Sequence, residues 1–428
     1  MIKPTSFALL IVAATVSIAS ADWPTFLGGD TEVSEFKPPM TWSPESNIAW
    51  TVDLTGHGQS SPIVIGDDVY VTAVDGPMKE SNLVMCFSLD DGAKKWERGF
   101  ASSLQVKNDV YTSRAAPSPV ADENGVYVFF ESGNMVALSP AGDVRWERNL
   151  IDDYGKYEGR FGLGGSVAQD DSHLFVLADN DGPAYIAAFE KATGKTAWKT
   201  DRSPRISWSS PMMVAIAGKP QVVVSSAGSV DGYDPGSGAL LWTFDEVGGN
   251  TVASPIAAEN SSFLIGASPG RNGEESEGAK QSNLLMKVSE AEGENKYTTE
   301  VVWRNTSATS SFGSPLVYRG HAYYTNRAGV VYCLDISTGE TVYTGRLPES
   351  NWATPVGIGE HVFVFGKDGT TAVLATGPEL DIVAENRLWA PSGEAKPGNF
   401  DGEIQYAVVP LPNGFLVRTG SKLVRIGE

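Results

Sequence analysis

The segment Ala188-Phe189-Glu190-Lys191-Ala192-Thr193-Gly194-Lys195-Thr196-Ala197-Trp198 places a small residue six positions before a Gly and ten positions before a Trp. The same spacing recurs along the 428-residue chain, so the segment is one copy of a repeat. The other copies are Cys86, Gly92 and Trp96; Gly232, Gly238 and Trp242; Cys333, Gly339 and Tyr343; and, one residue shorter, Ala137, Gly142 and Trp146. Self-similarity at a fixed period predicts a repeat architecture, and this unit decides the fold.

Each copy predicts four short strands. In the copy that contains Cys333, the strands are predicted at 314–317, 321–325, 330–335 and 340–343. Short β runs separated by turns at this spacing indicate an all-β array. The turn Asp-Ile-Ser-Thr-Gly at 335–339 contains side chains that can bond the local backbone and a Gly that can take positive φ. We expect this turn to return the aromatic residue beside the strand that precedes it.

Ser-Pro or Thr-Pro pairs mark the first strand of six units, Ser166-Val167 marks a seventh, and an eighth starts near Gln405. The eighth unit has only three strands before the chain ends, and residues 47–52 supply a fourth. Pairing the N-terminal strand with the last C-terminal strands removes the free edges of an open array. We therefore predict an all-β, eight-bladed β-propeller of four-stranded blades over 47–428. The pairs are Ser61-Pro62, Ser118-Pro119, Ser210-Pro211, Ser254-Pro255, Ser314-Pro315 and Thr354-Pro355.

The N-terminus has the pattern of a secretory signal peptide. Lys3 precedes an apolar stretch at 7–18, and Ala19-Ser20-Ala21 forms a small-residue cleavage site. We predict a cleaved signal peptide at 1–21 and a lead segment at 22–46, so the protein is expected to be exported and periplasmic or secreted. The residue directly after the expected cleavage site is Asp22 and not Cys, and no later apolar stretch is long enough to span a bilayer, so we expect neither a lipid anchor nor a membrane span.

Charge and cysteine content narrow the possible partners. The net charge of −20 repels phosphate backbones and anionic head groups, which argues against nucleic acid and lipid surfaces as partners. The two cysteines, Cys86 and Cys333, occupy the small position of the repeat, where other copies have Ala or Gly. We expect them to be buried small residues and not a disulfide. The mature protein is expected to be a monomer.

The spacing of residues 188–198 resembles the tryptophan-docking motif of the pyrroloquinoline-quinone (PQQ) propeller repeat superfamily, which includes quinoprotein alcohol dehydrogenases and the outer-membrane assembly factor BamB. The segment Asp22-Trp23-Pro24-Thr25-Phe26 also resembles the start of exported bacterial members. The resemblance covers nearly the whole mature chain and implies that large aromatic residues wedge between blades. The residues expected in this structural docking role are Trp50, Trp96, Trp146, Trp198, Trp242, Trp303, Tyr343 and Trp389.

The repeat says little about activity, because one fold hosts many functions. The resemblance implies that the dehydrogenases stack PQQ between a Trp and a disulfide of adjacent cysteines, beside Ca²⁺ held by Glu, Asn and Asp. This chain has no adjacent cysteines and no Cys-x-x-Cys-His, and its four histidines are scattered without metal-ligand spacing. We therefore expect no catalytic residue, no metal and no cofactor, with PQQ and calcium as the alternative.

The residues that enter the first strands are the candidates for a ligand or partner face at the funnel mouth. Gln59, Trp208, Phe312 and Trp352 each lie two positions before the Ser or Thr of a first strand and are expected to ring the axis. Aromatic residues edged by cations form either a plug of the channel or a recognition pocket. The candidate face consists of Gln59, Arg114, Arg205, Trp208, Phe312, Arg327, Trp352 and Lys367.

Two long loops at 98–117 and 148–165, rich in aromatic residues and Arg, are expected on the same face. Together these features favour an exported, non-catalytic binding or assembly scaffold of the PQQ-like propeller type, similar in architecture to BamB. Its ligand or partner, an envelope protein or a small molecule such as a glycan, is expected at the funnel face. A PQQ-dependent quinoprotein oxidoreductase and a glycan-binding propeller are the alternatives.

Overall fold

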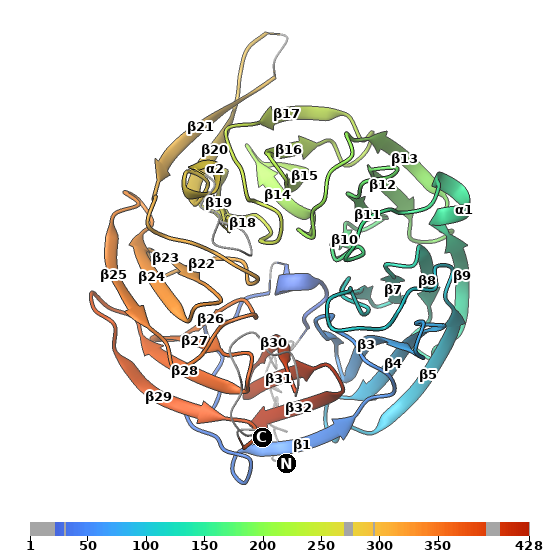
Figure 1. Ribbon diagram of the computed structural model, residues 1–428, viewed down its shortest axis with the longest axis horizontal. Coiled ribbons are helices and arrows are strands. Elements are labelled where there is room, and N and C mark those ends of the chain that lie inside the picture. Colours follow the sequence, from blue (N-terminus) through green and yellow to red (C-terminus); the bar gives the residue numbers. More distant parts are fainter. Residues whose placement is uncertain (1–21, 30, 269–276, 294–295, 391–402, 428) are drawn as a thin grey trace, which may run out of the picture.

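A computed structural model describes residues 22–29, 31–268, 277–293, 296–390 and 403–427. Within these ranges the strands form eight four-stranded antiparallel sheets arranged as blades around a central axis (Figure 1). The predicted all-β, eight-bladed propeller is confirmed. The predicted signal peptide lies outside the described residues, and the domain boundaries at 22, 47 and 428 remain predictions.

The blades are numbered in the chain order of their innermost strands, and the innermost strand is named first in each blade. Blades 1 and 2 are β2 (Ile63–Ile65), β3 (Asp68–Asp75), β4 (Ser81–Ser88), β5 (Lys94–Ala101), and β6 (Val120–Asp122), β7 (Gly125–Phe129), β8 (Asn134–Leu138), β9 (Val144–Asn149). Blades 3 and 4 are β10 (Ala168–Gln169), β11 (His173–Ala178), β12 (Tyr185–Glu190), β13 (Thr196–Asp201), and β14 (Met212–Ile216), β15 (Lys219–Ser226), β16 (Ser229–Tyr233), β17 (Leu240–Phe244).

Blades 5 and 6 are β18 (Ile256–Ala258), β19 (Ser262–Ile265), β20 (Leu284–Glu290), β21 (Tyr297–Arg304), and β22 (Leu316–Tyr318), β23 (His321–Thr325), β24 (Val330–Asp335), β25 (Thr341–Arg346). Blades 7 and 8 are β26 (Val356–Ile358), β27 (His361–Phe365), β28 (Thr370–Ala375), β29 (Ile382–Arg387), and β30 (Gln405–Leu411), β31 (Gly414–Thr419), β32 (Lys422–Gly427), β1 (Ile48–Asp53). Three short helices complete the described elements: η1 (Phe26–Gly28), α1 (Leu150–Tyr154) and α2 (Glu277–Lys280).

Blade 8 closes the ring with strands from both ends of the chain. β1 pairs antiparallel with β32, with Trp50 opposite Arg425 and Val52 opposite Leu423, after a bulge that follows Ile48. Figure 1 shows β1 beside β32 at this blade. The closure predicted from the three-stranded eighth unit is confirmed. β32 pairs with β31 on one side and with β1 on the other, so β1 covers the edge that β32 would otherwise leave open.

The small residue of the repeat lies directly opposite the aromatic residue on the neighbouring strand. Ala188 pairs with Trp198, and a β-bulge follows at once. The same cross-strand pairs join Cys86 to Trp96, Ala137 to Trp146, Gly232 to Trp242 and Cys333 to Tyr343. A larger residue would meet the ring, because a Cβ at Gly232 would lie 2.2 Å from the indole of Trp242. Both cysteines are accordingly buried and free.

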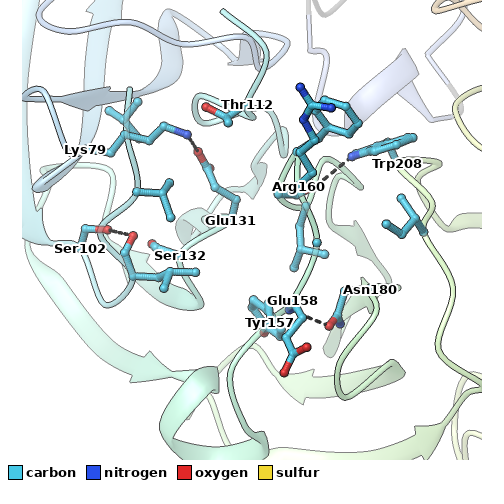
Figure 2. Close-up of a pocket in the computed structure, with 18 of the residues that line it drawn as sticks. Lys79, Ser102, Thr112, Glu131, Ser132, Tyr157, Glu158, Arg160, Asn180 and Trp208 are labelled. Atoms are coloured by element: carbon cyan, nitrogen blue, oxygen red, sulfur yellow. Dashed lines mark hydrogen bonds and ion pairs between the residues drawn. The ribbon is translucent and has the colours of Figure 1, made fainter. Parts of the chain in front are cut away.

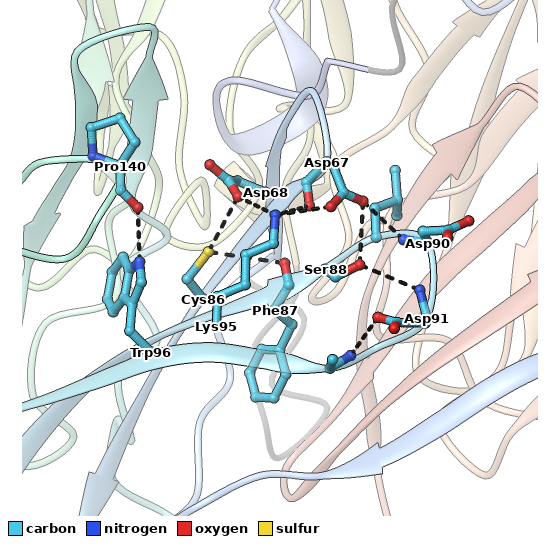
Figure 3. Close-up of polar contacts among 12 residues, drawn as sticks. Asp67, Asp68, Cys86, Phe87, Ser88, Asp90, Asp91, Lys95, Trp96 and Pro140 are labelled. Carbon is cyan, nitrogen blue, oxygen red and sulfur yellow. Dashed lines mark hydrogen bonds and ion pairs between the residues drawn. The ribbon is translucent and has the colours of Figure 1, made fainter.

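Five indoles dock on the turn of the following blade. Each of Trp50, Trp96, Trp146, Trp198 and Trp303 donates its Nε1 proton to a backbone carbonyl there, at 2.7–3.1 Å. The repeat Gly of that turn lies under the ring, with φ between 70° and 82°, and a Cβ on it would lie 2.3–2.8 Å from ring atoms. Figure 3 shows the bond from Trp96 to Pro140, beside the polar turn of blade 1. The Gly thus meets two demands at once, positive φ and close approach.

Three of the expected docking residues make different contacts. Trp242 donates to Gln221 Oε1 of its own blade and stacks on Phe263 of blade 5. Tyr343 keeps its place opposite Cys333, but a smaller ring replaces the indole. Trp389 lies beyond β29, where it packs against Gly369 of its own blade, and Ala384 takes the position opposite Val373. The added residues between the Gly and the Trp in blade 7 move the aromatic ring out of the strand.

Hydrogen bonds near the axis join blades 1 to 7 in series. In blades 1 to 6, the backbone N–H of the Ser that precedes the first strand donates to the hydroxyl oxygen of the equivalent Ser or Thr in the next blade, at 2.8–3.1 Å. The bonds run from Ser61 to Ser118, Ser166, Ser210, Ser254, Ser314 and Thr354. The Ser of the Ser-Pro marker therefore holds one blade to its neighbour, since a buried N–H needs a partner.

The lead segment covers the end of the axis opposite these Ser residues. Trp23 pairs with Val64 of β2, and the Pro24 carbonyl accepts from Ala121 N and Gln169 Nε2. In Figure 1 this blue segment lies across the centre of the ring. One face of the propeller is thus occupied by the lead segment and the docking turns. The entrance loops lie on the opposite face, which we call the loop face.

Replacing Trp198 by Ala is expected to lower the free energy of unfolding by about 3–5 kcal/mol, because the change removes a buried indole and leaves a cavity over Gly238. Denaturant unfolding measures the loss. Leu240→Ala, at an exposed position of β17, is the control and should change stability by less than about 0.5 kcal/mol. Equal stability of the Trp198 variant and the wild type would contradict the docking role.

Replacing Ser210 by Ala is expected to lower the free energy of unfolding by about 1–3 kcal/mol, because the buried N–H of Ser166 loses its acceptor. Ser209→Ala is a matched control: Ser209 is also buried, but its hydroxyl has no partner among the described residues. Thermal and denaturant unfolding should therefore separate the two adjacent variants. Equal losses would show that this series of bonds does not contribute.

Candidate functional site

A cleft opens on the loop face between blades 1, 2 and 3 (Figure 2). The space between its walls is about 710 Å³, part of it open to solvent. We call it the loop cleft. Its walls include Lys79, Ser102, Thr112, Glu131, Arg160 and Trp208.

Backbone bonds between neighbouring loops hold the cleft together. The loop after β5 is fixed to the turn before β4, because Val106 N donates to Met78 O and Ser102 N to Glu80 O. Farther along, Ser113 N donates to Phe161 O at 2.7 Å and joins the two long loops. Across the cleft, Trp208 Nε1 donates to Gly162 O at 2.9 Å. These bonds place both loops predicted from the sequence on one side of the funnel.

A buried ion pair forms the floor near blade 1. Lys79 Nζ lies 3.8 Å from Glu131 Oε1 and also donates to the Ser113 carbonyl. Glu131 in turn accepts from the backbone N–H of Ala115, at 3.0 and 3.1 Å. Burial raises the pKa of the Glu131 carboxyl, and the Lys79 charge opposes this shift.

Lys79 and Glu131 form hydrogen bonds with the backbone on either side of Arg114. Ala115 adopts φ 47°, a left-handed conformation that costs free energy for a residue with a Cβ. The contacts to Ser113 O and Ala115 N hold this strained turn in place. Gln59 adds two more bonds, since its N donates to Arg114 O and its Oε1 accepts from Arg114 N. The ion pair therefore positions Arg114 toward the axis.

A second group of residues lies at the seam between blades 8 and 1, and we call it the seam cluster. It consists of His57, Arg114, Tyr406 and Arg418. Arg114 Nη2 donates to Tyr406 Oη at 3.3 Å, and the rings of His57 and Tyr406 meet edge to face at 6.0 Å. Arg418 is fully buried on β31 and reaches across to the Thr72 carbonyl of β3 at 2.7 Å.

The electrostatics of the seam cluster disfavour further positive charge. Burial, and then the charges of Arg114 and Arg418, lower the pKa of His57 to about 3. Burial also lowers the pKa of Arg418 to about 9, with a small opposing effect from Tyr406. His57 is accordingly a neutral imidazole at physiological pH.

The candidate face predicted from the sequence divides into two groups. Gln59 and Arg114 join the seam cluster, and Trp352 reaches it through Tyr406, with ring centroids 6.0 Å apart. Phe312 lies against Trp352 at 4.6 Å and is 41% exposed.

Trp208 and Arg205 lie on the other side, by the loop cleft. Trp208 packs against Phe161, while Arg205 donates to Ser229 Oγ at 2.9 Å. The two remaining face residues are anchored through their backbones, Arg327 N to Ser311 Oγ and Lys367 N to Ser350 O. Six of the face residues lie in the loops that enter the innermost strands, and Arg327 and Lys367 lie in the turns between the second and third strands of blades 6 and 7, so strand alternation does not set their orientation.

Sequence reasoning did not single out Lys79, Glu131, His57, Tyr406 or Arg418. For Arg418 a signal was available, because it interrupts the apolar run Gly-Phe-Leu-Val in β31. The other four stand alone in loops or at strand ends of different blades. Their proximity arises from ring closure, and no local pattern predicts it.

The arrangement that the superfamily resemblance implies for PQQ was compared with the residues present. Cys86 and Cys333 lie in the cores of blades 1 and 6, so they cannot form the adjacent pair. In the described ranges, no group of three or more His, Cys, Asp and Glu side chains is placed to hold a metal ion. The residues described do not fit that arrangement, and we derive no chemical step through PQQ.

The closed eight-bladed ring, with aromatic residues docked between blades, defines a propeller of the PQQ-like class. The sequence model of the family described as "Outer membrane protein assembly factor BamB" matches residues 40–161, 156–271 and 289–425. This chain therefore belongs to the BamB family of PQQ-like propellers.

Individual relatives are distant. The outer membrane protein assembly factor BamB of Alkalilimnicola ehrlichii is 24% identical over 224 residues, which is 51% of this chain and 51% of that protein. The match thus spans about half the length of the curated relative. The crystal structure of BamB from Moraxella catarrhalis superposes with a TM-score of 0.60 at 14% identity, covering 89% of this chain and 97% of that one.

The quinohemoprotein alcohol dehydrogenase of Comamonas testosteroni superposes almost as well, with a TM-score of 0.59 at 13% identity, covering 95% of this chain and 81% of that one. At these identities the two solved structures show the shared fold alone. Among the described residues, no helix has the length and apolar character needed to cross a membrane.

The depressed pKa of His57 predicts a loss of stability in acid. Between about pH 6.5 and pH 3 the unfolded chain binds a proton at His57 that the folded protein does not bind, so the free energy of unfolding falls as the pH falls through this window. At pH 5 the contribution is on the order of 2 kcal/mol.

Urea unfolding from pH 7.5 to pH 4.5 measures this fall in the free energy of unfolding. His57→Asn should flatten the pH dependence, whereas His321→Asn, at a partly exposed position, should keep the wild-type slope. Parallel slopes for the wild type and the His57 variant would show that His57 is not held neutral.

Proposed function

We propose that this protein is an exported, non-catalytic assembly scaffold of the BamB type that binds an envelope protein at the loop face. Membership of the BamB family supports the class of function, since the family takes its description from outer membrane protein assembly. The proposal also places the mature chain in the periplasm, where such a partner would be reached. The loop cleft is the proposed docking position.

The observation that carries the docking position is the Arg160–Phe161 pair at the cleft. The Arg160 guanidinium lies 5.2 Å from the centroid of the Phe161 ring, and Phe161 packs in turn against Trp208. Aromatic residues and Arg are enriched at the energetic centres of protein interfaces. Met78 and Tyr111, on the loops that build the same side, add large apolar side chains that are 41% and 48% exposed.

The charge pattern agrees with this position. The chain carries a net charge of −20, so a partner that docks over the whole surface would have to be basic. Arg160 instead offers a cation on an aromatic surface, which suits a partner segment with apolar and acidic residues. The hydrogen bonds from Ser113 N to Phe161 O and from Trp208 Nε1 to Gly162 O hold this surface rigid before binding.

Crosslinking in the envelope of the source cells tests the proposal. The wild type should recover a defined envelope protein, and the double variant Arg160→Ala/Phe161→Ala should reduce its recovery about tenfold or more, as expected when an interface anchor is removed. Leu240→Ser, which changes an exposed residue on the outer strand of blade 4, should recover the partner as well as the wild type does.

The outcomes separate the alternatives. Equal recovery by the cleft variant would place the partner elsewhere on the propeller. Empty captures from all three proteins would contradict the scaffold function. Titrations of the wild type with PQQ plus Ca²⁺ and with oligosaccharides, followed by Trp fluorescence, would then distinguish a quinoprotein from a glycan-binding propeller.

A further inference from the structure

Three arginine side chains are buried among the described residues, Arg114, Arg202 and Arg418, and only Arg202 has acidic partners there. Arg202 is paired with Asp179 and Asp231, with N–O distances of 2.8 and 3.0 Å. Arg418 is fully buried, yet among the described residues its guanidinium donates only to neutral oxygens. These are Thr419 O at 3.0 Å, Thr72 O at 2.7 Å and Ser60 Oγ at 3.5 Å. A buried charge without a counterion is costly, so Arg418 requires an explanation.

The surroundings of Arg418 add positive charge. Arg114, 8% exposed, bonds Tyr406 through Nη2, but its Nε has no hydrogen-bond partner within the described ranges. His57 Nε2 is likewise buried and unpartnered there. Both guanidinium groups act electrostatically on His57. Glu131, on the far side of the Arg114 backbone, is engaged by Lys79 and Ala115 N.

We infer that the seam cluster is an anion-binding site for a small oxyanion, a carboxylate or a phosphate, held by Arg114 and Arg418 beside His57. The planar guanidinium group matches the paired oxygens of carboxylate and phosphate, and charge-assisted hydrogen bonds of this kind are the stronger class. The unpartnered Nε of Arg114 and Nε2 of His57 are the atoms offered for these bonds. Tyr406 contacts both residues, because its hydroxyl accepts from Arg114 Nη2 and its ring meets the His57 ring edge to face.

Two glycines make room for this arrangement and limit the size of the anion. A Cβ at Gly58 would lie 2.2 Å from Arg418 Nη2, and a Cβ at Gly420 would lie 1.9 Å from His57 Cε1. Neither Gly has positive φ, so backbone conformation does not require a Gly at either position. Close approach of the Arg418 and His57 side chains is the remaining reason, and a seam packed this tightly admits only a small anion.

A bound anion would also offset the unbalanced positive charge around His57 and Arg418. Burial and mutual repulsion lower the pKa of His57 to about 3, and burial lowers that of Arg418. An anion beside these groups favours their charged forms, so it raises both pKa values. The histidine signal therefore reports binding directly and without a catalytic assay.

The test follows the four imidazoles of the mature chain by NMR at pH 6, while sodium sulfate, phosphate or acetate replaces sodium chloride at constant ionic strength. At least one oxyanion should shift the His57 signal in a saturable way, leaving His173, His321 and His361 unchanged. Acetate and phosphate as separate arms distinguish a carboxylate site from a phosphate site. A His57→Asn variant assigns the signal.

Arg114→Gln should weaken binding and so raise the half-saturating anion concentration at least tenfold. Arg205→Gln, outside the cluster, should not change this concentration. Arg418→Met provides a second variant that removes the buried charge without adding a polar group, and it should abolish the saturable shift while the protein remains folded. No saturable shift with any of the three oxyanions would overturn the inference. So would equal shifts of all four histidines, which would show general screening only.

Discussion

The contact between an indole and the glycine of the next blade is the constraint on which the propeller depends. In the copy that ends at Trp198, the ring is fitted from two sides: Ala188 opposite it on its own sheet and Gly238 beneath it on the next. A bulge follows the first contact, and a carbonyl of the second turn accepts the indole proton. One side chain thereby fixes the outer spacing of two blades, and the buried Ser residues fix the inner spacing.

This division of roles explains why the two faces differ. The docking turns and the lead segment occupy one face, where the Asp-to-Gly turn must keep its length and its positive φ. The opposite face carries no such requirement, so its loops can lengthen. The loop cleft arises there because residues 102–113 and 157–163 fold toward each other and are joined by backbone bonds. The candidate partner surface is therefore built on loops held by a rigid ring.

Buried cations at three places on the loop face differ in whether they have acidic partners. Arg202 has two carboxylates, and Lys79 has Glu131, so these cations are balanced inside the fold. Lys79 and Glu131 also hold the strained backbone at Ala115, which presents Arg114 to the axis. At the seam, the side chains of Arg114 and Arg418 donate only to neutral acceptors among the described residues, so their charges are not balanced there. The imbalance coincides with the blade that is assembled from both ends of the chain.

The sequence by itself determined the fold class, the number of blades and the closing strand. These follow from local spacing: the small residue, the Gly and the Trp must recur at fixed intervals because each turn and each cross-strand pair is short-range. It also assigned Gln59 and Arg114 to one candidate face, and in the structure the two residues are hydrogen-bonded, while their role in binding stays a prediction. It did not give the place of Trp389, because added residues before it in blade 7 put the ring beyond the end of β29, and spacing alone does not reveal where such residues are accommodated.

Only the tertiary structure decided which residues share a site. Thr72 and Arg418 are separated by 346 positions, and their contact exists because the ring closes. The sequence expected one ring of aromatic residues, whereas the folded chain gives Trp208 to the cleft and Trp352 to the seam. Loop residues carry no periodic signal, since their positions are set by tertiary hydrogen bonds and not by strand alternation. The repeat thus specifies the scaffold, and ring closure specifies the chemistry placed on it.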